Sequence, residues 1–233
     1  MEAHFTWFNL LFEHFGISHE FIPIAGSILA TFVVIVLSLL GRAALGRGEA
    51  AISPASRFSL KGFFEAFIEM MSALTTMVLG SHGKDFLPMF GAIFFYILLN
   101  NLIGLIPGLS AATSNINVTL SLGLFSFLAY NVIGFAHSGV HYFKHFMGPV
   151  WWLVPILLPI ELISNIVRPF SLGIRLSVNM TADHAILGTF IDLTKIGVPV
   201  IFYGMGTFVS LVQAFVFTIL SMVYVMMATA DSH

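Results

Sequence analysis

Five ionisable side chains are concentrated in one otherwise apolar stretch of the chain, residues 159–184. They are Glu161, Arg168, Arg175, Asp183 and His184, and apolar runs lie on both sides of the stretch. A charged side chain at the centre of a membrane costs about 3 kcal/mol even on lenient insertion scales. If this stretch crosses a membrane, each of these groups therefore needs a partner, water or an ion pathway.

Helical geometry places most of these groups, with two amides, on one stripe. At about 100° per residue, six positions fall within a sector about 80° wide. They are Glu161, Asn165, Arg168, Arg175, Asn179 and Asp183. His184 points about 100° away from Asp183, and Pro169 should kink the helix because it has no N–H to donate to the carbonyl of Asn165. Charges of both signs on one face indicate an aqueous or protein-lined route for ions.

The two arginines of this stripe differ in how strongly they indicate function. Arg168 is equally compatible with a simple structural role, in which it snorkels to lipid headgroups and pairs with Glu161 near a helix end. Arg175 lies between apolar turns with no Trp or Tyr nearby to mark a membrane interface. A functional role is therefore favoured for Arg175.

The composition shows what kind of chain carries this stripe. Of its 233 residues, 58% are hydrophobic and only 9% are charged, whereas soluble domains carry about 25% charged residues. This excludes a soluble globular fold, and the apolar content also excludes disorder. The net charge of −2 gives no basic field for nucleic acid, and the absence of Cys excludes disulfides and thiolate metal sites.

Three charge-free stretches predict membrane-spanning helices. Residues 21–41 fit one span of about 20 residues. Residues 86–143 fit two spans, with a turn at 107–115, and residues 196–230 fit one helix that is strongly tilted or bends near Gly204 and Gly206. The predicted fold class is all-α, a polytopic transmembrane protein forming a single membrane domain over residues 1–233.

The positive charges predict the orientation of these helices. Lys and Arg are found within 42–85 and at Lys144, but neither at 107–115 nor in the first 20 residues. The positive-inside rule then places 42–85 and 138–148 in the cytoplasm, and residues 1–20 outside as an external N-terminal segment. Residues 1–20 contain no basic residue and so do not resemble a secretory signal.

Residues 58–79 differ from the predicted spans. Polar side chains recur every three or four residues and apolar ones fill the other side. This pattern predicts an amphipathic helix on the cytoplasmic membrane surface; the alternative is a short helix packed on the protein's own loops.

Several motifs together resemble one family. The run RPFSLGIRL at 168–176, followed by Asn179 and Met180, resembles subunit a of F-type ATP synthases. Three further stretches agree with that family: NNLIGLIP at 100–107, INVTLSL at 116–122 and LVQAFVF at 211–217. The resemblance covers residues 20–230.

The resemblance implies a stator role beside a rotating ring of c subunits. It assigns Arg175 to the essential arginine between two offset proton half-channels and Glu161 to a carboxylate of the proton route. Asn179 matches a polar residue near the arginine, and Gln213 matches the glutamine on the last helix that faces it. Ser171 matches a small residue of the motif, and Asn165 and Arg168 are supporting residues.

The implied partners are the oligomeric c-ring, peripheral-stalk b subunits, membrane lipid and protons rather than Na⁺. The resemblance implies no cofactor or metal. Residues 150–230 would form long tilted helices that face the ring. The chain itself would be a non-catalytic channel subunit, located in a bacterial plasma membrane.

The chain departs from the family pattern at three positions. His184 stands where many bacterial relatives have Glu, and Asp183 stands where many relatives have Gly. The last helix often carries an ionisable residue seven positions before the glutamine, where this chain has Gly206. Asp183 and His184 are the hypothesised replacement, since a His with a nearby carboxylate can relay protons near neutral pH. Alternatively, Asp183 only balances the charge of His184 or Arg175.

Two other functions are less well supported. A stand-alone secondary transporter often shows inverted repeats, which are not evident in the sequence. An intramembrane hydrolase would need a nucleophile and base, and none is visible.

His141 and His145 have the spacing of zinc ligands on a helix, but a solvated loop is the favoured interpretation.

Overall fold

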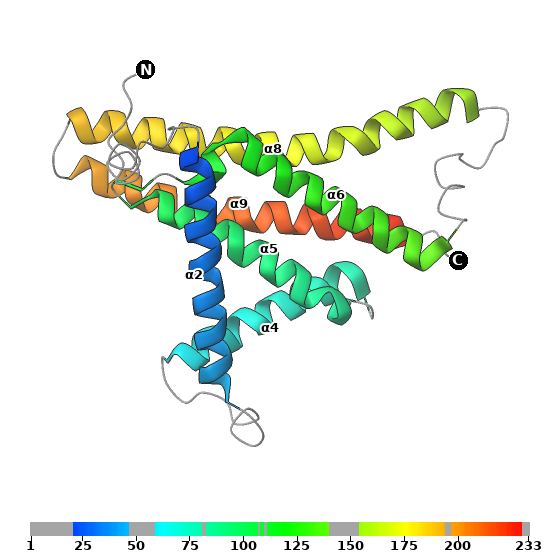
Figure 1. Ribbon diagram of the computed structural model, residues 1–233, viewed down its shortest axis with the longest axis horizontal. Helices are drawn as coiled ribbons and strands as arrows, with labels where there is room; N and C mark the ends of the chain where they lie inside the picture. Colours follow the sequence, from blue (N-terminus) through cyan, green and yellow to red (C-terminus); the bar gives the residue numbers. More distant parts are fainter. Residues whose placement is uncertain are drawn as a thin grey trace. The chain divides into compact units, whose positions relative to one another are not determined.

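The computed structural model describes residues 21–46, 59–80, 83–106, 108–109, 111–139, 154–193 and 197–229. Within these ranges the chain is helical and contains no strand (Figure 1). The elements are α2 (Ile22–Leu45), α4 (Leu60–Leu79), α5 (Gly83–Gly104), the 3₁₀ turn η3 (Ala112–Ser114), α6 (Ile116–Ser138), α8 (Val154–Leu193) and α9 (Val198–Thr229). All six α-helices are long and apolar enough to cross a membrane. The predicted fold class, a polytopic all-α membrane protein, is confirmed.

The chain divides into two compact units, residues 1–112 and 113–233. The first unit contains α2, α4 and α5, and the second contains α6, α8 and α9. The single membrane domain predicted from the sequence stays a prediction.

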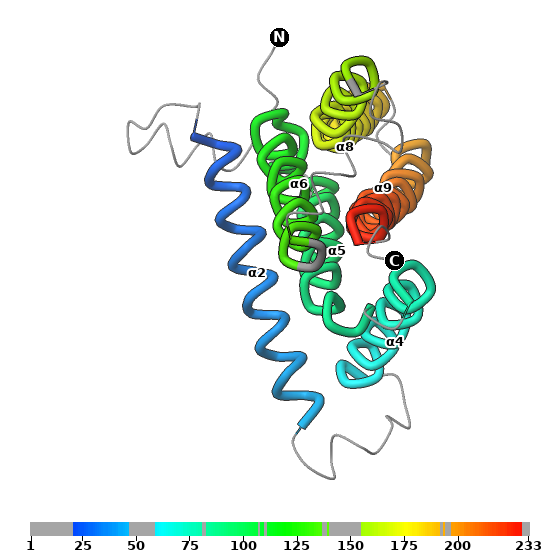
Figure 2. Tube along the Cα trace, turned by 90° about the vertical axis from the view of Figure 1, so that its right-hand side faces the viewer, coloured from blue at the N-terminus to red at the C-terminus, as the bar shows by residue number. Residues whose placement is uncertain are grey.

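Aromatic side chains hold the first unit together. The ring of Phe67 on α4 lies 5.8 Å from that of Phe94 and 5.3 Å from that of Phe95, both on α5. On α2, a Cβ at Gly41 would lie 2.7 Å from the ring of Phe64, so a larger residue at this position would require that ring to move. Figure 2 shows the paths of α2, α4 and α5.

Local signals in the sequence begin and end these helices. The side chain of Ser59 accepts a hydrogen bond from the Gly62 N–H at the start of α4, and Asn115 accepts one from the Asn117 N–H at the start of α6. Gly80 and Gly139 follow these two helices with φ of 65° and 55°, a conformation that favours glycine.

The predicted turn between the second and third spans is present. α5 ends at Gly104, and η3 and α6 follow within the next dozen residues. The side chain of Asn100, which is 1% exposed, accepts a hydrogen bond of 3.1 Å from the Ala112 N–H and so fixes this connection to α5.

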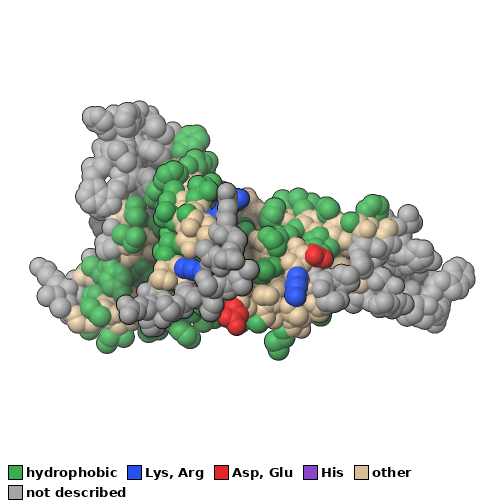
Figure 3. Space-filling view, turned by 90° about the horizontal axis from the view of Figure 1, so that it is seen from below, with side chains coloured by type: hydrophobic (Ala, Val, Ile, Leu, Met, Phe, Trp, Pro, Cys, Tyr) green, Lys and Arg blue, Asp and Glu red, His purple; other side chains and the backbone are tan. Residues whose placement is uncertain are grey.

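The outer faces of the helices are apolar. On α2, for example, Ile28, Phe32 and Leu39 are 65%, 62% and 61% exposed. On the face drawn in Figure 3, charged side chains form only small patches among hydrophobic and uncharged ones. Such faces suit hydrocarbon rather than water, as the low charge content predicted.

The two C-terminal helices are long, as expected. α8 runs for 40 residues through Pro159 and Pro169 without interruption, and Figure 1 shows it bending along its length. α9 runs for 32 residues, and neither Gly204 nor Gly206 interrupts it.

The amphipathic stretch at 58–79 is helical, because α4 spans Leu60–Leu79. Its location on the membrane surface stays a prediction. Residues 1–20 lie outside the described residues, as do His141 and His145, so the predictions that concern them are not tested.

Candidate functional site

Two glycines let α6 and α8 meet backbone to backbone in the second unit. A Cβ at Gly123 on α6 would collide with the carbonyl oxygen of Pro169 on α8. A Cβ at Gly173 on α8 would lie 2.9 Å from the carbonyl oxygen of Thr119 and 3.0 Å from the Cα of Leu120. Since backbone atoms cannot rotate away as a side chain can, this contact fixes the middle of α8 against α6. We call it the glycine contact.

Buried hydrogen bonds join α6 to its two neighbours. The Tyr130 hydroxyl on α6 donates to the side-chain oxygen of Asn165 on α8, and Tyr130 and Asn165 are only 2% and 5% exposed. The hydroxyl of Ser126 donates to that of Ser221 on α9 over 2.8 Å, and both are buried. In hydrocarbon such polar groups need protein partners, so these contacts specify how the three helices align.

Arg168 has partners within the unit. Its Nη2 lies 3.6 Å from Glu161 Oε1, and its guanidinium carbon lies 5.4 Å from the centre of the Tyr224 ring on α9. The carboxylate and the aromatic face both compensate the positive charge. The ion pair with Glu161 matches the structural interpretation that the sequence left open.

Arg175 lies two turns further along α8 in different surroundings. Its side chain is exposed, and it forms no ion pair with any described residue. The next residue, Leu176, is 0% exposed and packs inward. The helix is therefore buried on one side and, within the part of the chain that the structure describes, presents a guanidinium without an ion pair on the other.

A polar contact between α8 and α9 lies one turn beyond Arg175. The Asn179 Nδ2 donates to the Gln213 Oε1 over 2.8 Å, and Gln213 is 4% exposed. The two residues are 34 positions apart in the chain, and the resemblance had placed each of them near the arginine.

Asp183 lies one further turn along and is half-buried. Its Oδ2 is buried and has no hydrogen-bond partner in the part of the chain that the structure describes. His184 is also half-buried. Asn179, which forms the contact with Gln213, precedes Asp183 by one turn on α8.

The polar stripe predicted on α8 follows the border between its buried and exposed faces. Asn165 is buried, and Glu161, Arg168, Asn179 and Asp183 are half-buried. Arg175 and Ser171 are exposed, so any packing by Ser171 is against lipid or another subunit.

Sequence reasoning missed the partners that other helices supply to α8. Tyr130, Ser126, Ser221 and Tyr224 lie in apolar segments, and only their hydroxyl groups or aromatic rings could have marked them. It also missed a second contact that holds α8 in place. The hydroxyls of Ser177 and Thr181 on α8 both donate to the carbonyl of Ser114 in η3, over 2.9 and 3.2 Å.

The arrangement can do one kind of chemistry. One arginine is paired inside the unit, whereas the other is exposed on a helix whose opposite side is buried. Such a group attracts an anion brought by another molecule, and a carboxylate such as that of Asp183 can accept and release a proton.

Comparison with known proteins gives the family. Residues 24–226 match the family described as ATP synthase A chain. The chain is 51% identical over 230 residues to ATP synthase subunit a of Bdellovibrio bacteriovorus, which covers 98% of this chain and 99% of that one. It is 37% identical over 209 residues to ATP synthase subunit a of Trichlorobacter lovleyi, covering 90% and 89% of the two chains, and 34% identical over 209 residues to that of Geobacter sulfurreducens, covering 90% of each. The length and extent of these matches, together with the arginine-bearing α8, show that the chain belongs to the ATP synthase subunit a family.

Proposed function

We propose that this chain is the proton-translocating stator subunit of the membrane sector of an F-type ATP synthase. The observation that carries the proposal is the exposed Arg175, which is anchored in an apolar helix and has no ion pair among the described residues. The stand-alone transporter is not favoured, because the family is that of an ATP synthase subunit.

The partner of Arg175 is a carboxylate on an oligomeric ring of c subunits. A guanidinium keeps its charge at any working pH, whereas a buried lysine can lose its proton. Arg175 therefore attracts each ring carboxylate as that group becomes ionised. It also holds a fixed positive charge on the direct path, and this charge prevents protons from leaking across.

Two half-channels bring protons to and from the ring. Asp183, His184, Asn179 and Gln213 form one end of the route, where the buried Asp183 Oδ2 is open to protonation. Glu161 lies on the other side of Arg175 along α8. Arg168 positions it through the 3.6 Å ion pair, and the hydrogen bond between Asn165 and Tyr130 fixes this part of α8 against α6.

The chain converts proton flow into rotation and does not itself catalyse ATP formation. One charge crossing 100 mV releases about 2.3 kcal/mol, so several protons are needed for each ATP. Peripheral-stalk b subunits hold the chain against the torque. The proposed location is a bacterial inner membrane, with the N-terminus outside and the coupling ion a proton rather than Na⁺.

The test is Arg175→Ala in membranes that contain the assembled complex. ATP-driven proton pumping should fall to the level of membranes without the complex, and passive proton leak should rise. Arg175→Lys should restore only a small part of the pumping. Normal pumping by Arg175→Ala in a complex that contains normal amounts of this chain would refute the proposal.

A further inference from the structure

The first unit contains an apolar cavity of about 550 Å³ between α2, α4 and α5. Its walls include Val34 on α2, Phe67 and Met71 on α4, and Leu87 and Phe95 on α5. Small-molecule sites measure about 300–1,000 Å³, so the cavity has the volume of a ligand site.

A glycine on α5, which has no side chain to fill the space, keeps this cavity open. Gly91 is one of the lining residues, and a Cβ at this position would meet nothing within 4 Å. The walls offer water few hydrogen-bonding partners, since most of them are hydrocarbon. In a membrane, the occupant that suits such walls is a lipid chain.

The polar end of the cavity determines which lipid fits. Arg42 and Ser38, one turn apart on α2, also line the cavity. Arg42 lies in the last turn of α2, is exposed, and has no ion pair among the residues the structure describes. A guanidinium binds phosphate oxygens through two parallel hydrogen bonds, and basic pockets between membrane helices bind anionic headgroups.

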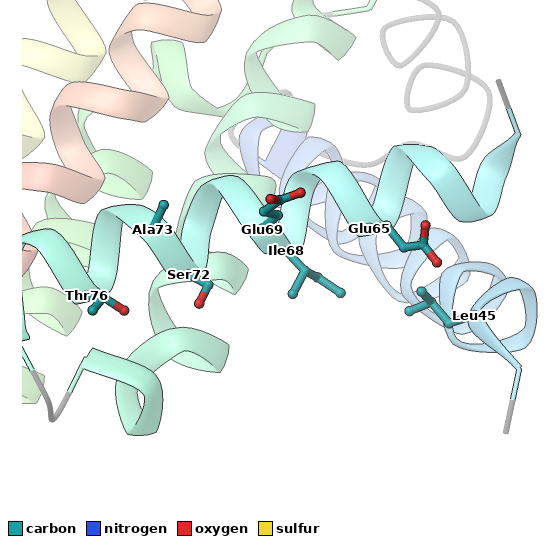
Figure 4. A pocket seen from close by; sticks show the side chains of 7 residues that line it. All are labelled: Leu45, Glu65, Ile68, Glu69, Ser72, Ala73 and Thr76. Atoms are coloured by element: carbon teal, nitrogen blue, oxygen red, sulfur yellow. The ribbon is translucent and has the colours of Figure 1, made fainter. Parts of the chain in front are cut away.

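A second hollow on α4 offers the opposite charge. It has a volume of about 640 Å³ and is lined by Glu65, Glu69, Ser72 and Thr76, with Leu45 from the end of α2 (Figure 4). Glu65 is paired with Lys61 at 3.6 Å, but Glu69 is exposed and has no ion pair among the described residues. An anionic headgroup is therefore repelled by this hollow and attracted by Arg42.

We propose that the cavity between α2, α4 and α5 is a binding site for one anionic phospholipid. An acyl chain fills the space beside Gly91, and the phosphate group binds Arg42. None of the residues that line the cavity belongs to the proposed proton route, so the proposed function would stand if this site were absent.

Photo-crosslinking tests this proposal in the assembled complex. The complex is placed in nanodiscs with a trace of phosphatidylglycerol that carries a diazirine midway along one acyl chain, or with phosphatidylcholine that carries the same chain. We expect the anionic probe to label peptides of α2, α4 and α5 at least threefold more than the neutral probe does. Equal labelling by the two probes would show non-selective boundary lipid, and no labelling would show that a neighbouring subunit fills the cavity; either result overturns the proposal.

Two variants separate the headgroup from the acyl chain. Arg42→Gln should reduce labelling by the anionic probe to the level of the neutral one. Gly91→Leu, which fills the cavity, should remove labelling by both probes. Gly204→Leu on α9 is the matched control, because a Cβ there also meets nothing within 4 Å, and it should leave labelling unchanged. Labelling that persists in Gly91→Leu contradicts the site.

Discussion

Two arginines on one helix have opposite surroundings in this chain. Arg168 is compensated by Glu161 and the Tyr224 ring, whereas Arg175 is exposed and has no ion pair among the described residues. The two residues carry the same charge, so the difference comes from their neighbours, which for Arg168 are a carboxylate on α8 itself and an aromatic ring on α9. At the scale of single residues, these two partners decide that the charge of Arg175, and not that of Arg168, remains available.

Asp183 is the residue on which the proton relay depends. Asp183→Gly removes the carboxyl group, and ATP-driven pumping should fall at least about tenfold, since positioned proton-transfer groups contribute about 10²–10⁴-fold. Asp183→Glu should recover part of the rate. Unchanged pumping by Asp183→Gly would mean that Asp183 only balances charge.

The pair formed by Asn179 and Gln213 should be energetically coupled. Asn179→Leu and Gln213→Leu each leave one amide without its partner, whereas the double variant leaves none. Hydrogen bonds between membrane helices contribute about 0.6 kcal/mol on average and at most about 1.7, so a double-mutant cycle should give a coupling free energy in this range. Unfolding of the purified chain in mixed detergent micelles, followed by circular dichroism, measures it, and additive effects would contradict the contact.

At the scale of elements, the glycine contact determines how α6 and α8 cross. The sequence predicted α6 as a span and the turn before it from Pro107 and its polar neighbours, and the family resemblance implied a long helix where α8 lies. It could not predict the crossing, because Gly123 and Gly173 are ordinary residues of apolar segments until Pro169 and Thr119 are brought next to them.

Adding one methyl group should separate these helices. In Gly123→Ala and Gly173→Ala the new Cβ meets backbone atoms of the other helix, and overpacking of this kind costs about 1–3 kcal/mol. The thermal midpoint of the purified complex should fall, together with the amount of assembled complex. Gly204→Ala, where a Cβ has open space, should behave like the unmodified protein; a similar loss in all three would show that helix glycines matter for another reason.

At the scale of the whole molecule, composition alone predicted the fold class. A chain with 9% charged residues cannot cover a surface in water, and the apolar outer faces of its helices agree. The site was predicted where its residues lie on one helix, as with Glu161 and Arg168. The contacts of Asn165 with Tyr130 and of Ser126 with Ser221 join residues 35 and 95 positions apart, so no local pattern could reveal them.

The proposed ring contact can be tested with a single introduced thiol, because the chain has no Cys. Ile174 lies next to Arg175 and is 44% exposed. Ile174→Cys, modified with a benzophenone maleimide and irradiated in membranes, should form an adduct with subunit c. Val132→Cys on α6, at a position 64% exposed, is the control and should give little of that adduct. Adducts of Ile174→Cys with lipid alone would argue against a ring at this face.

The glycine contact also has a mechanical consequence. Gly173 is two residues from Arg175, so a sideways force that the ring exerts on the guanidinium is transmitted through only two residues of α8 to the glycine contact. An interface made of side chains can deform when those side chains change rotamer, and such an interface would lose part of the applied force as local movement. A contact between two helix backbones deforms much less, and the force on α8 is therefore transmitted to the backbone of α6.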